Sequence, residues 1–298
     1  MPARVHAPGA RSARRKVRGL PVTEAVHPAG AALERLSTSR LVRRLHDGDR
    51  EAVAAVGRAV PALSALVDAT ASRLSRGGRL VYAGAGTSGR LGALDAAECP
   101  PTFGVSPTRV VALVAGGPRA LRQAVEGAED DRAAAARAVA AARVGPRDLV
   151  VGVSASGTTP FVLAALAAAR RRGAATALVT SNPAARAPVD HRVVLETGPE
   201  RIAGSTRMKA GTAAKMALGL LSSAAFVRLG AVREGRMVAL RPASAKLRDR
   251  AIRNVAALAG VDAGAARRRL SASGWDVGAA IAVAAGKARR GRPRGGAR

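Results

Sequence analysis

Residues 78–100 read GRLVYAGAGTSGRLGALDAAECP. An apolar run at 80–83 leads into a glycine-rich turn at 84–89, and a helix-compatible segment follows. A turn between a strand and a helix directs several backbone N–H groups and the helix dipole at one point, which favours an anion. Thr87 and Ser88 add two hydroxyls to the turn. The stretch therefore predicts an anion-binding loop at the end of a buried strand.

The same succession of a short apolar run and a helical pattern recurs along the chain. Strands of near-continuous apolar content that alternate with helices indicate a parallel sheet covered on both faces. We therefore predict an α/β fold with a doubly wound, five-stranded parallel sheet, whose ligands bind beyond the carboxyl ends of the strands. The expected strands are 80–83, 110–114, 149–153, 174–180 and 193–195, and the expected helices include 51–74, 120–142, 160–172 and 211–229, with a turn at 46–50.

The chain divides into four expected segments. The first twenty residues and the last thirteen are rich in Arg, Gly and Pro and hold no acid, which is typical of disordered tails. From about residue 243 the pattern is helical without a strand signal, with helices expected at 246–260, 263–270 and 277–285. We expect a basic tail at 1–22, a main domain with N-terminal helices at 23–235, a three-helix unit at 236–285 and a basic tail at 286–298.

The net charge of +29 raises the possibility of a nucleic-acid partner. The two tails carry much of the excess, and aromatic residues make up only 2% of the chain, which leaves no stacking surface for bases. We therefore expect no specific nucleic-acid partner. The single cysteine, Cys99, excludes an internal disulfide, and no apolar run reaches membrane-spanning length, so a soluble, cytoplasmic protein is the expectation.

Gly84, Gly86 and Gly89 fit the dinucleotide-binding pattern G-x-G-x-x-G. That reading requires an acidic residue at the end of the second strand to hold a ribose. The second strand instead runs into Ala115, Gly116 and Gly117. A purely structural turn and a phosphate site therefore both stay open on this evidence.

Two further loops favour the phosphate site. The second loop, residues 154–160, reads SASGTTP and opens a helix, and the third loop, residues 204–212, reads GSTRMKAGT and opens another. Hydroxyl groups can donate to phosphate oxygens without a charge of their own. Arg207 and Lys209 add two positive charges in the third loop. Either loop alone could be a capped helix start, but together the loops predict a shared phosphomonoester site.

Acids near the loops are the candidates for chemistry. Glu98 follows the first loop, and Glu126, Glu129, Asp130 and Asp131 cluster after the second strand. Two carboxylates that face a bound sugar can act as base and acid if burial or repulsion raises one pKa. The alternative is that the cluster forms a solvated helix face. The four histidines show no metal-ligand spacing, and Cys99 has no basic neighbour to activate it.

Four segments together resemble the N-acetylmuramic acid 6-phosphate etherase family, a group of sugar isomerase (SIS) domain proteins related to the glucokinase regulatory protein. The resemblance spans residues 23–285 and implies an SIS fold, a homodimer and no metal or organic cofactor. It also implies cleavage of the lactyl ether of N-acetylmuramate 6-phosphate to N-acetylglucosamine 6-phosphate and D-lactate. The segments are GRLVYAGAGTSGRLGALDAAECPPTFGV (78–105), AGGPRALRQAVEGAEDD (115–131), DLVVGVSASGTTPFVLAAL (148–166) and GSTRMKAGTAAKMAL (204–218).

The resemblance also implies roles for single residues. Glu98 matches the acid that protonates the leaving lactate oxygen, and Glu129 matches the second catalytic carboxylate. Two positions depart from the family pattern, because Thr158 stands where many members have Arg and His27 where Asn is usual. The expected substrate-binding residues are Gly86, Thr87, Ser88, Ser156, Gly157, Thr159, Ser205, Arg207 and Lys209.

Two other classes of protein are compatible with parts of the sequence. A non-catalytic sugar-phosphate sensor would share the third loop, but it would not need both Glu98 and Glu129. A transcription regulator with a sugar-binding domain would account for the basic charge, but no convincing N-terminal helix-turn-helix is present. The etherase is therefore the leading hypothesis.

Overall fold

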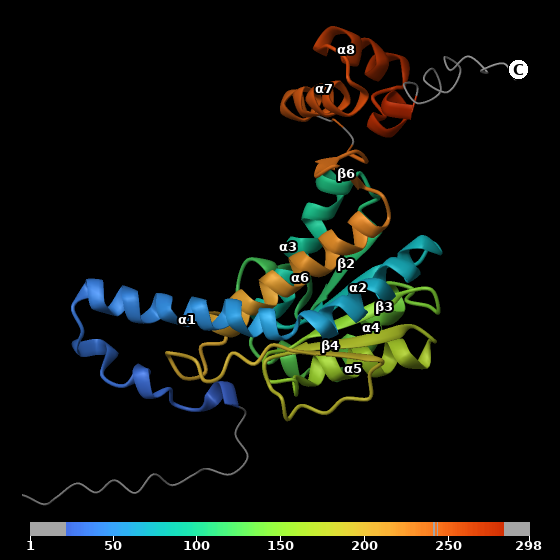
Figure 1. The fold of residues 1–298 in the computed structure, drawn as a ribbon. Coiled ribbons are helices and arrows are strands. Elements are labelled where there is room, and N and C mark those ends of the chain that lie inside the picture. The colour runs from blue at the N-terminus through green and yellow to red at the C-terminus, as the bar shows by residue number, and fades with distance from the viewer. Residues whose placement is uncertain (1–21, 241, 243, 283–298) are drawn as a thin grey trace, which may run out of the picture.

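The computed structural model describes residues 22–240, 242 and 244–282 (Figure 1). The basic tails expected at 1–22 and 286–298 lie outside the described residues, apart from Val22. The last expected helix begins at Val277 and is described as far as Ala282, so its expected end at residue 285 also lies outside the described residues.

A five-stranded sheet forms the centre of the molecule. All neighbouring strands run parallel, in the order β2-β1-β3-β4-β5, which confirms the predicted α/β class. The first four strands lie within one residue of their predicted bounds, whereas the fifth begins two residues earlier than expected. The strands are β1 (Leu80–Gly84), β2 (Val110–Val114), β3 (Leu149–Val153), β4 (Ala175–Thr180) and β5 (His191–Val194).

Helices cover both faces of the sheet, as strands without polar alternation require (Figure 1). Successive residues of a strand serve opposite faces, so Leu80 and Tyr82 join one apolar core while Val81 and Ala83 join the other. The first core is covered by α1 (Thr38–Arg58), α2 (Val60–Ser75), α3 (Gly86–Phe103) and α6 (Lys209–Arg228), and the second by α4 (Arg132–Ala141) and α5 (Pro160–Arg171).

The N-terminal helices differ from the prediction. The turn expected at 46–50 is part of α1, which begins directly after its N-cap Ser37. The single helix expected at 51–74 is instead divided between α1 and α2, which meet at Ala59 with a bend of 62°. Pro61 explains the break, because proline lacks the N–H of a helix interior but fits a first helical turn.

The segment after β2 also differs from the prediction. The helix expected at 120–142 begins only at Arg132, and two short 3₁₀ turns precede it. Gly127, the N-cap of the second turn, adopts a left-handed φ of +71°, which interrupts the predicted helix. The Asp131 carboxylate caps α4 by accepting from the Ala134 amide at 2.7 Å. The acids at 126–131 therefore do not form a helix face.

The C-terminal unit has an apolar core of its own, which includes Ala251, Val255, Leu270 and Val277. It contains α7 (Ala245–Ala259), α8 (Ala263–Ala272) and the helix that begins at Val277. A two-stranded hairpin that the sequence did not predict, β6 (Val232–Arg233) and β7 (Arg236–Met237), precedes it. The domain boundary expected between residues 235 and 236 falls in the turn of this hairpin.

Helix α6 is the one described helix that is long and apolar enough by itself to cross a bilayer. More than half of its apolar window is buried, and it packs against α1, α2 and α3. Its composition is therefore that of a core helix.

An ion pair joins the amino-terminal ends of β1 and β3. The Arg79 guanidinium donates to both Asp148 oxygens, at 3.2 Å and 2.7 Å, and the backbone amides of Arg79 and Gly145 donate to the same carboxylate. Burial by itself would raise the pKa of Asp148, but these hydrogen bonds outweigh it and hold the pKa below its usual value. The pair therefore fixes the start of two central strands.

We expect Asp148→Asn to lower the free energy of unfolding at neutral pH by about 3 kcal/mol, because it leaves a half-buried guanidinium without its counter-charge. The folded-state pKa of Asp148 lies below its unfolded value, so the stabilisation is complete above about pH 4 and is lost as the pH falls through the folded-state pKa. Urea titrations of wild type and variant between neutral and acidic pH measure both effects. A difference that does not shrink in acid would contradict this account.

Candidate active site

A small hollow lies beyond the carboxyl ends of the strands. Its lining combines the three loops singled out from the sequence, because Ser88, Ser154 and Thr206 all contribute to it. The ends of β4 and the start of α6 complete the wall with Thr180, Ser181, Ala210 and Gly211. The parallel strands thus bring together segments that are more than a hundred residues apart in the chain.

The first loop joins β1 to α3 with very little space between them. A Cβ on Gly84 would lie 2.6 Å from the Gly89 nitrogen, and one on Gly89 would lie 2.7 Å from the Gly84 oxygen. Gly86, the first residue of α3, has a φ of +53°, a value that L-residues rarely adopt. The N-cap Ala85 makes no side-chain hydrogen bond to the helix start, so no capping side chain occupies the amides of the first turn.

Hydroxyl groups organise the second loop. Ser154 Oγ accepts from the Gly157 amide at 3.0 Å and lies 2.8 Å from Thr159 Oγ1. Ser156 Oγ accepts from both the amide and the hydroxyl of Thr158, at 3.2 Å and 3.0 Å. Thr158, the departure from the family pattern, is therefore part of the loop's internal bonding.

The sequence reasoning missed the last residue of β4 and the residues directly after it. Asn182 donates from its side-chain amide to the Ser156 carbonyl at 2.9 Å, and Thr180 donates to the Ala155 carbonyl at 3.2 Å. Ser181 lines the hollow itself. The available signal was their position, since polar residues directly after a buried parallel strand lie at the ligand-binding edge.

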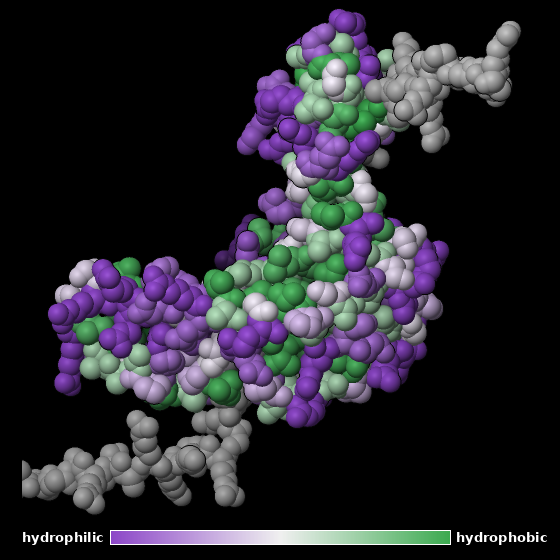
Figure 2. All heavy atoms as spheres, in the orientation of Figure 1, coloured by the Kyte–Doolittle hydropathy of each residue, from purple (hydrophilic) through white to green (hydrophobic). Residues whose placement is uncertain are grey.

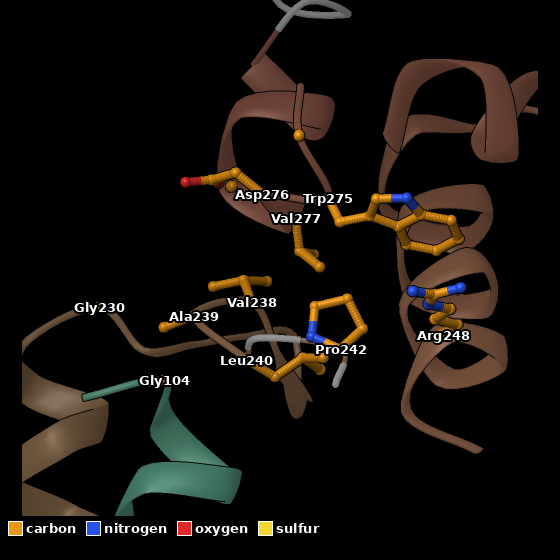
Figure 3. Close-up of a pocket in the computed structure, with 12 residues that line it drawn as sticks. Gly104, Gly230, Val238, Ala239, Leu240, Pro242, Arg248, Trp275, Asp276 and Val277 are labelled. Carbon is orange, nitrogen blue, oxygen red and sulfur yellow. The ribbon is translucent and has the colours of Figure 1, made fainter. Parts of the chain in front are cut away.

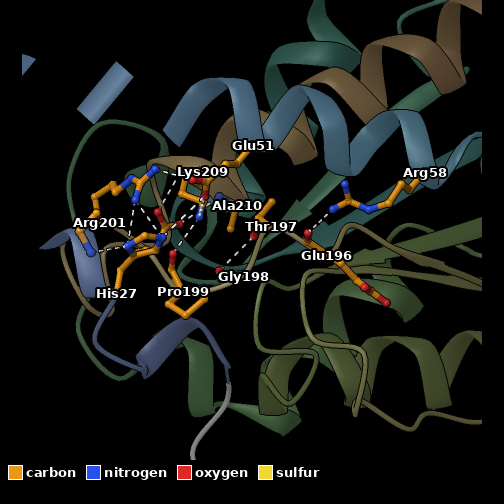
Figure 4. Close-up of polar contacts among 12 residues, drawn as sticks. His27, Glu51, Arg58, Glu196, Thr197, Gly198, Pro199, Arg201, Lys209 and Ala210 are labelled. Atoms are coloured by element: carbon orange, nitrogen blue, oxygen red, sulfur yellow. Dashed lines mark hydrogen bonds and ion pairs between the residues drawn. The ribbon is translucent and has the colours of Figure 1, made fainter. Parts of the chain in front are cut away.

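The third loop does not place both of its positive charges at the hollow. Lys209 is 2% exposed, and its ammonium pairs with Glu51 and donates to the Pro199 carbonyl at 2.8 Å (Figure 4). The structure therefore assigns Lys209 to this pair, of which only the lysine is buried, and not to the lining of the hollow. Arg207 is exposed, and Ser205 is half-buried beside Thr206.

A buried carboxylate, which sequence reasoning also missed, occupies the N-terminus of α6. Glu200 is fully buried, and its two oxygens accept from the amides of Lys209 and Ala210, each at 3.0 Å. Burial raises the pKa of Glu200, although these hydrogen bonds partly oppose the shift. Because a carboxylate already satisfies this helix start, a phosphate is better accommodated by the first and second loops.

Both candidate catalytic carboxylates are exposed in the single chain. Glu98 lies twelve residues into α3, about 18 Å along the helix axis from Gly86. Glu129 lies in a 3₁₀ turn at 128–130 that packs against α5, the helix that the second loop opens. The structure therefore places Glu129 on a neighbour of the second loop, and Glu98 about three helical turns beyond the start of α3.

Two other titratable groups of α3 are withdrawn from solvent, since Cys99 is buried and Asp95 is half-buried. Asp95 accepts from the Tyr82 hydroxyl at 2.8 Å and from the Ser222 hydroxyl at 2.9 Å, and burial raises its pKa. Burial and the nearby Asp95 raise the pKa of Cys99 to about 12, so its thiol stays protonated and unreactive at neutral pH. Both groups pack α3 onto β1 and α6.

No group of three or more His, Cys, Asp or Glu side chains converges on a possible metal site within the part of the chain that the structure describes. A larger hollow of about 780 Å³ lies elsewhere, between the end of α3, the hairpin and the C-terminal unit (Figure 3). Its wall includes Gly104, Trp275 and Arg248, whose guanidinium lies 5.3 Å from the Trp275 ring centre. None of the predicted site residues lines it.

Comparison with known proteins identifies relatives along most of the chain. Residues 62–170 match the family described as the glucokinase regulatory protein N-terminal SIS domain. A phosphoheptose isomerase from Francisella tularensis, among solved structures, covers 64% of this chain and 98% of its own, at 17% identity and a TM-score of 0.48.

Curated relatives are more similar. An N-acetylmuramic acid 6-phosphate etherase from Deinococcus radiodurans is 53% identical over 88% of this chain and 86% of its own length. One from Cutibacterium acnes is 46% identical over 89% and 88%, and one from Serratia proteamaculans is 45% identical over 88% and 89%. At this level of identity over nearly the whole described region, the chain belongs to the N-acetylmuramic acid 6-phosphate etherase family.

Proposed function

We propose that this protein cleaves the D-lactyl ether of N-acetylmuramate 6-phosphate, with N-acetylglucosamine 6-phosphate and D-lactate as products, in the breakdown and recycling of cell-wall amino sugars. The observation that carries the proposal is the hollow at the carboxyl ends of the strands, where hydroxyl-rich loops and a helix start converge in a chain that keeps both Glu98 and Glu129. Hydroxyls and free amides suit a phosphate, and the two carboxylates suit proton transfer.

The chemistry follows from the substrate. In the ring-opened sugar the C1 aldehyde acidifies the C2 proton, so a carboxylate base can remove it. The C3–O bond then breaks, lactate leaves as its ether oxygen is protonated, and a C2–C3 double bond forms. Water adds to C3, and a proton returns to C2. The sum is ether plus water to alcohol plus lactate, and no oxidant or reductant is needed.

The residues divide into two groups by role. The first-loop amides with Thr87 and Ser88, and the second-loop Ser156 and Thr159, hold the phosphate and fix the sugar, which supplies the positional part of the rate enhancement. Glu98 acts as the acid toward the lactate oxygen, and Glu129 is the second carboxylate. Gly86 and Gly157 have φ values of +53° and +70°, which L-residues rarely adopt, and so permit the turns of both loops.

A sensor of sugar phosphates is the alternative function. The match to the glucokinase regulatory protein domain favours it. A sensor requires the phosphate cradle alone, whereas an etherase also requires two carboxylates in reach of C2 and C3. Turnover, not binding, therefore separates the two functions.

We expect the purified wild-type protein to release D-lactate and N-acetylglucosamine 6-phosphate in equal amounts from N-acetylmuramate 6-phosphate. A coupled lactate assay with mass spectrometry of the sugar measures both products. In ¹⁸O-labelled water the label enters the sugar, since water adds to C3. Tight sugar-phosphate binding without lactate would leave only the sensor, and label in lactate would exclude elimination.

Replacing the proposed acid gives a second prediction. We expect Glu98→Gln to lower kcat by about 10²–10⁴, the usual contribution of a general acid, with little change in the Kd for N-acetylglucosamine 6-phosphate. Glu126→Gln, which removes another exposed carboxylate of the etherase-like segments, serves as the matched control and keeps wild-type kcat. Normal turnover by Glu98→Gln would exclude this residue as the acid.

We further propose that a second copy of the chain completes each site. Leu94 on α3 and Leu220 and Val227 on α6 are each about half exposed, and these two helices pack side by side. Figure 2 shows the apolar area over this part of the molecule. Glu98 lies on the same helix as Leu94, about 18 Å along the axis from Gly86. A symmetric dimer through α3 and α6 brings Glu98 toward the partner.

Subunit complementation tests this arrangement. Glu98→Gln lacks the acid, and Ser156→Asp places a carboxylate where the phosphate binds, so each variant alone is inactive. If Glu98 serves the partner subunit, mixed dimers from co-expression regain one intact site, and the random mixture shows about a quarter of wild-type activity. Activity no greater than that of the single variants would show that Glu98 acts within its own chain.

The cytoplasm is the proposed location. A phosphorylated sugar does not cross a bilayer unaided, and the only cysteine is buried as a free thiol, which suits a reducing compartment.

We propose no specific nucleic-acid partner, because the described surface offers few aromatic side chains for stacking.

A further inference from the structure

We propose that Glu51 is a positioning residue that holds both ends of segment 201–209 and thereby shapes the substrate site. The segment leaves the sheet after β5 and carries Ser205 and Thr206 before it enters α6. Sequence reasoning gave Glu51 no role. The inference rests on the proposed function for the identity of the ligand.

The carboxylate of Glu51 bonds to the two ends of the segment with separate oxygens. Arg201 Nη2 donates to Oε1, and Lys209 Nζ donates to Oε2 (Figure 4). Arg201 is the first residue of the segment and Lys209 the last. One side chain of α1 therefore joins the two ends of a nine-residue segment.

The two cations that Glu51 contacts are shielded from solvent. Arg201 is 8% exposed and Lys209 2% exposed, so neither cation is well solvated. His27 lies beside them, with both ring nitrogens 2.9 Å from Arg201 Nη1, and its pKa is lowered by burial and by the neighbouring cations. His27 is thus a neutral partner. Glu51 is the more exposed acid of the cluster, with 40% of its side chain exposed, whereas the buried Glu200 caps α6. The charges of Arg201 and Lys209 are therefore balanced within the cluster by Glu51 and Glu200.

The chain on either side of the cluster is packed tightly against the segment. A Cβ on Gly30 would lie 2.3 Å from the Arg201 carbonyl oxygen, and one on Gly48 would lie 3.1 Å from the Lys209 side chain. The Gly204 amide donates to the Thr23 carbonyl at 3.1 Å. The N-terminal turns and α1 therefore form the surface on which the segment rests.

The segment in turn touches the phosphate cradle. Thr206 lines the hollow, and Gly211, two residues beyond the segment, lies so close to the first loop that a Cβ there would be 3.4 Å from Thr87 Cγ2. A shift of the segment therefore changes the wall opposite the first and second loops. Because the substrate contacts this wall in both the ground state and the transition state, a displaced wall should weaken substrate binding more than it slows the chemical step.

The test is Glu51→Gln in the full-length protein. We expect the KM for N-acetylmuramate 6-phosphate and the Kd for N-acetylglucosamine 6-phosphate to rise about tenfold, the size of one lost charged hydrogen bond, with kcat within about twofold of wild type. Amide hydrogen exchange should accelerate in residues 201–209. Glu51→Asp keeps the charge but shortens the reach, so its values should fall between those of wild type and Glu51→Gln, and it replaces Glu51→Gln if that variant does not fold.

Asp49→Asn is the matched control, because Asp49 is an acid on the same helix whose side chain is 45% exposed and bonds only to His46 at 3.2 Å among the described contacts. It should leave binding and exchange unchanged. Wild-type Kd and exchange in the Glu51 variants, or equal effects of Asp49→Asn, would overturn the proposal. Failure of wild type to release lactate would refute the proposed function instead, since sugar-phosphate binding and exchange are measured without turnover.

Discussion

The close approach of β1 to the first turn of α3 is the constraint on which the site depends. Gly84 and Gly89 face each other with no room for a Cβ on either. This contact aims the amides of the first turn at the carboxyl edge of the sheet, where the second loop and the start of α6 also arrive. With a larger residue at Gly84, helix and strand would separate, and the anion-binding geometry would be lost with them.

The described lining of the hollow is uncharged, and the charged side chains near it have other partners. The described lining of the hollow contains hydroxyls, small apolar residues and backbone, while Lys209 is withdrawn into a pair with Glu51, and Glu200 occupies the start of α6. A phosphate would therefore be bound chiefly by oriented dipoles, which cost little reorganisation when it enters. The strongly basic composition of the chain does not translate into a cationic pocket.

Much of the fold could be predicted from sequence because its signals are local. The continuous apolar runs of β1 to β4 and the glycine and hydroxyl loops that follow them identify a parallel sheet and its binding edge. The errors lie where tertiary contacts or single residues override periodicity, as at Pro61, which divides the long N-terminal helix, and Gly127, which delays α4. Glu51 and Glu200 could not be identified, because their roles arise from partners about 150 residues away or from burial at a helix start.

The ion pair of Arg79 and Asp148 lies at the amino-terminal edge of the sheet, opposite to the hollow. The molecule thus separates the side that secures its strands from the side that meets small molecules. For protein engineering, this separation means that resistance to heat or acid can be tuned around Arg79 and Asp148 while specificity is evolved at the other end. The two properties can be selected in parallel libraries and then combined, because residues at opposite edges of the sheet are far enough apart for their effects to add.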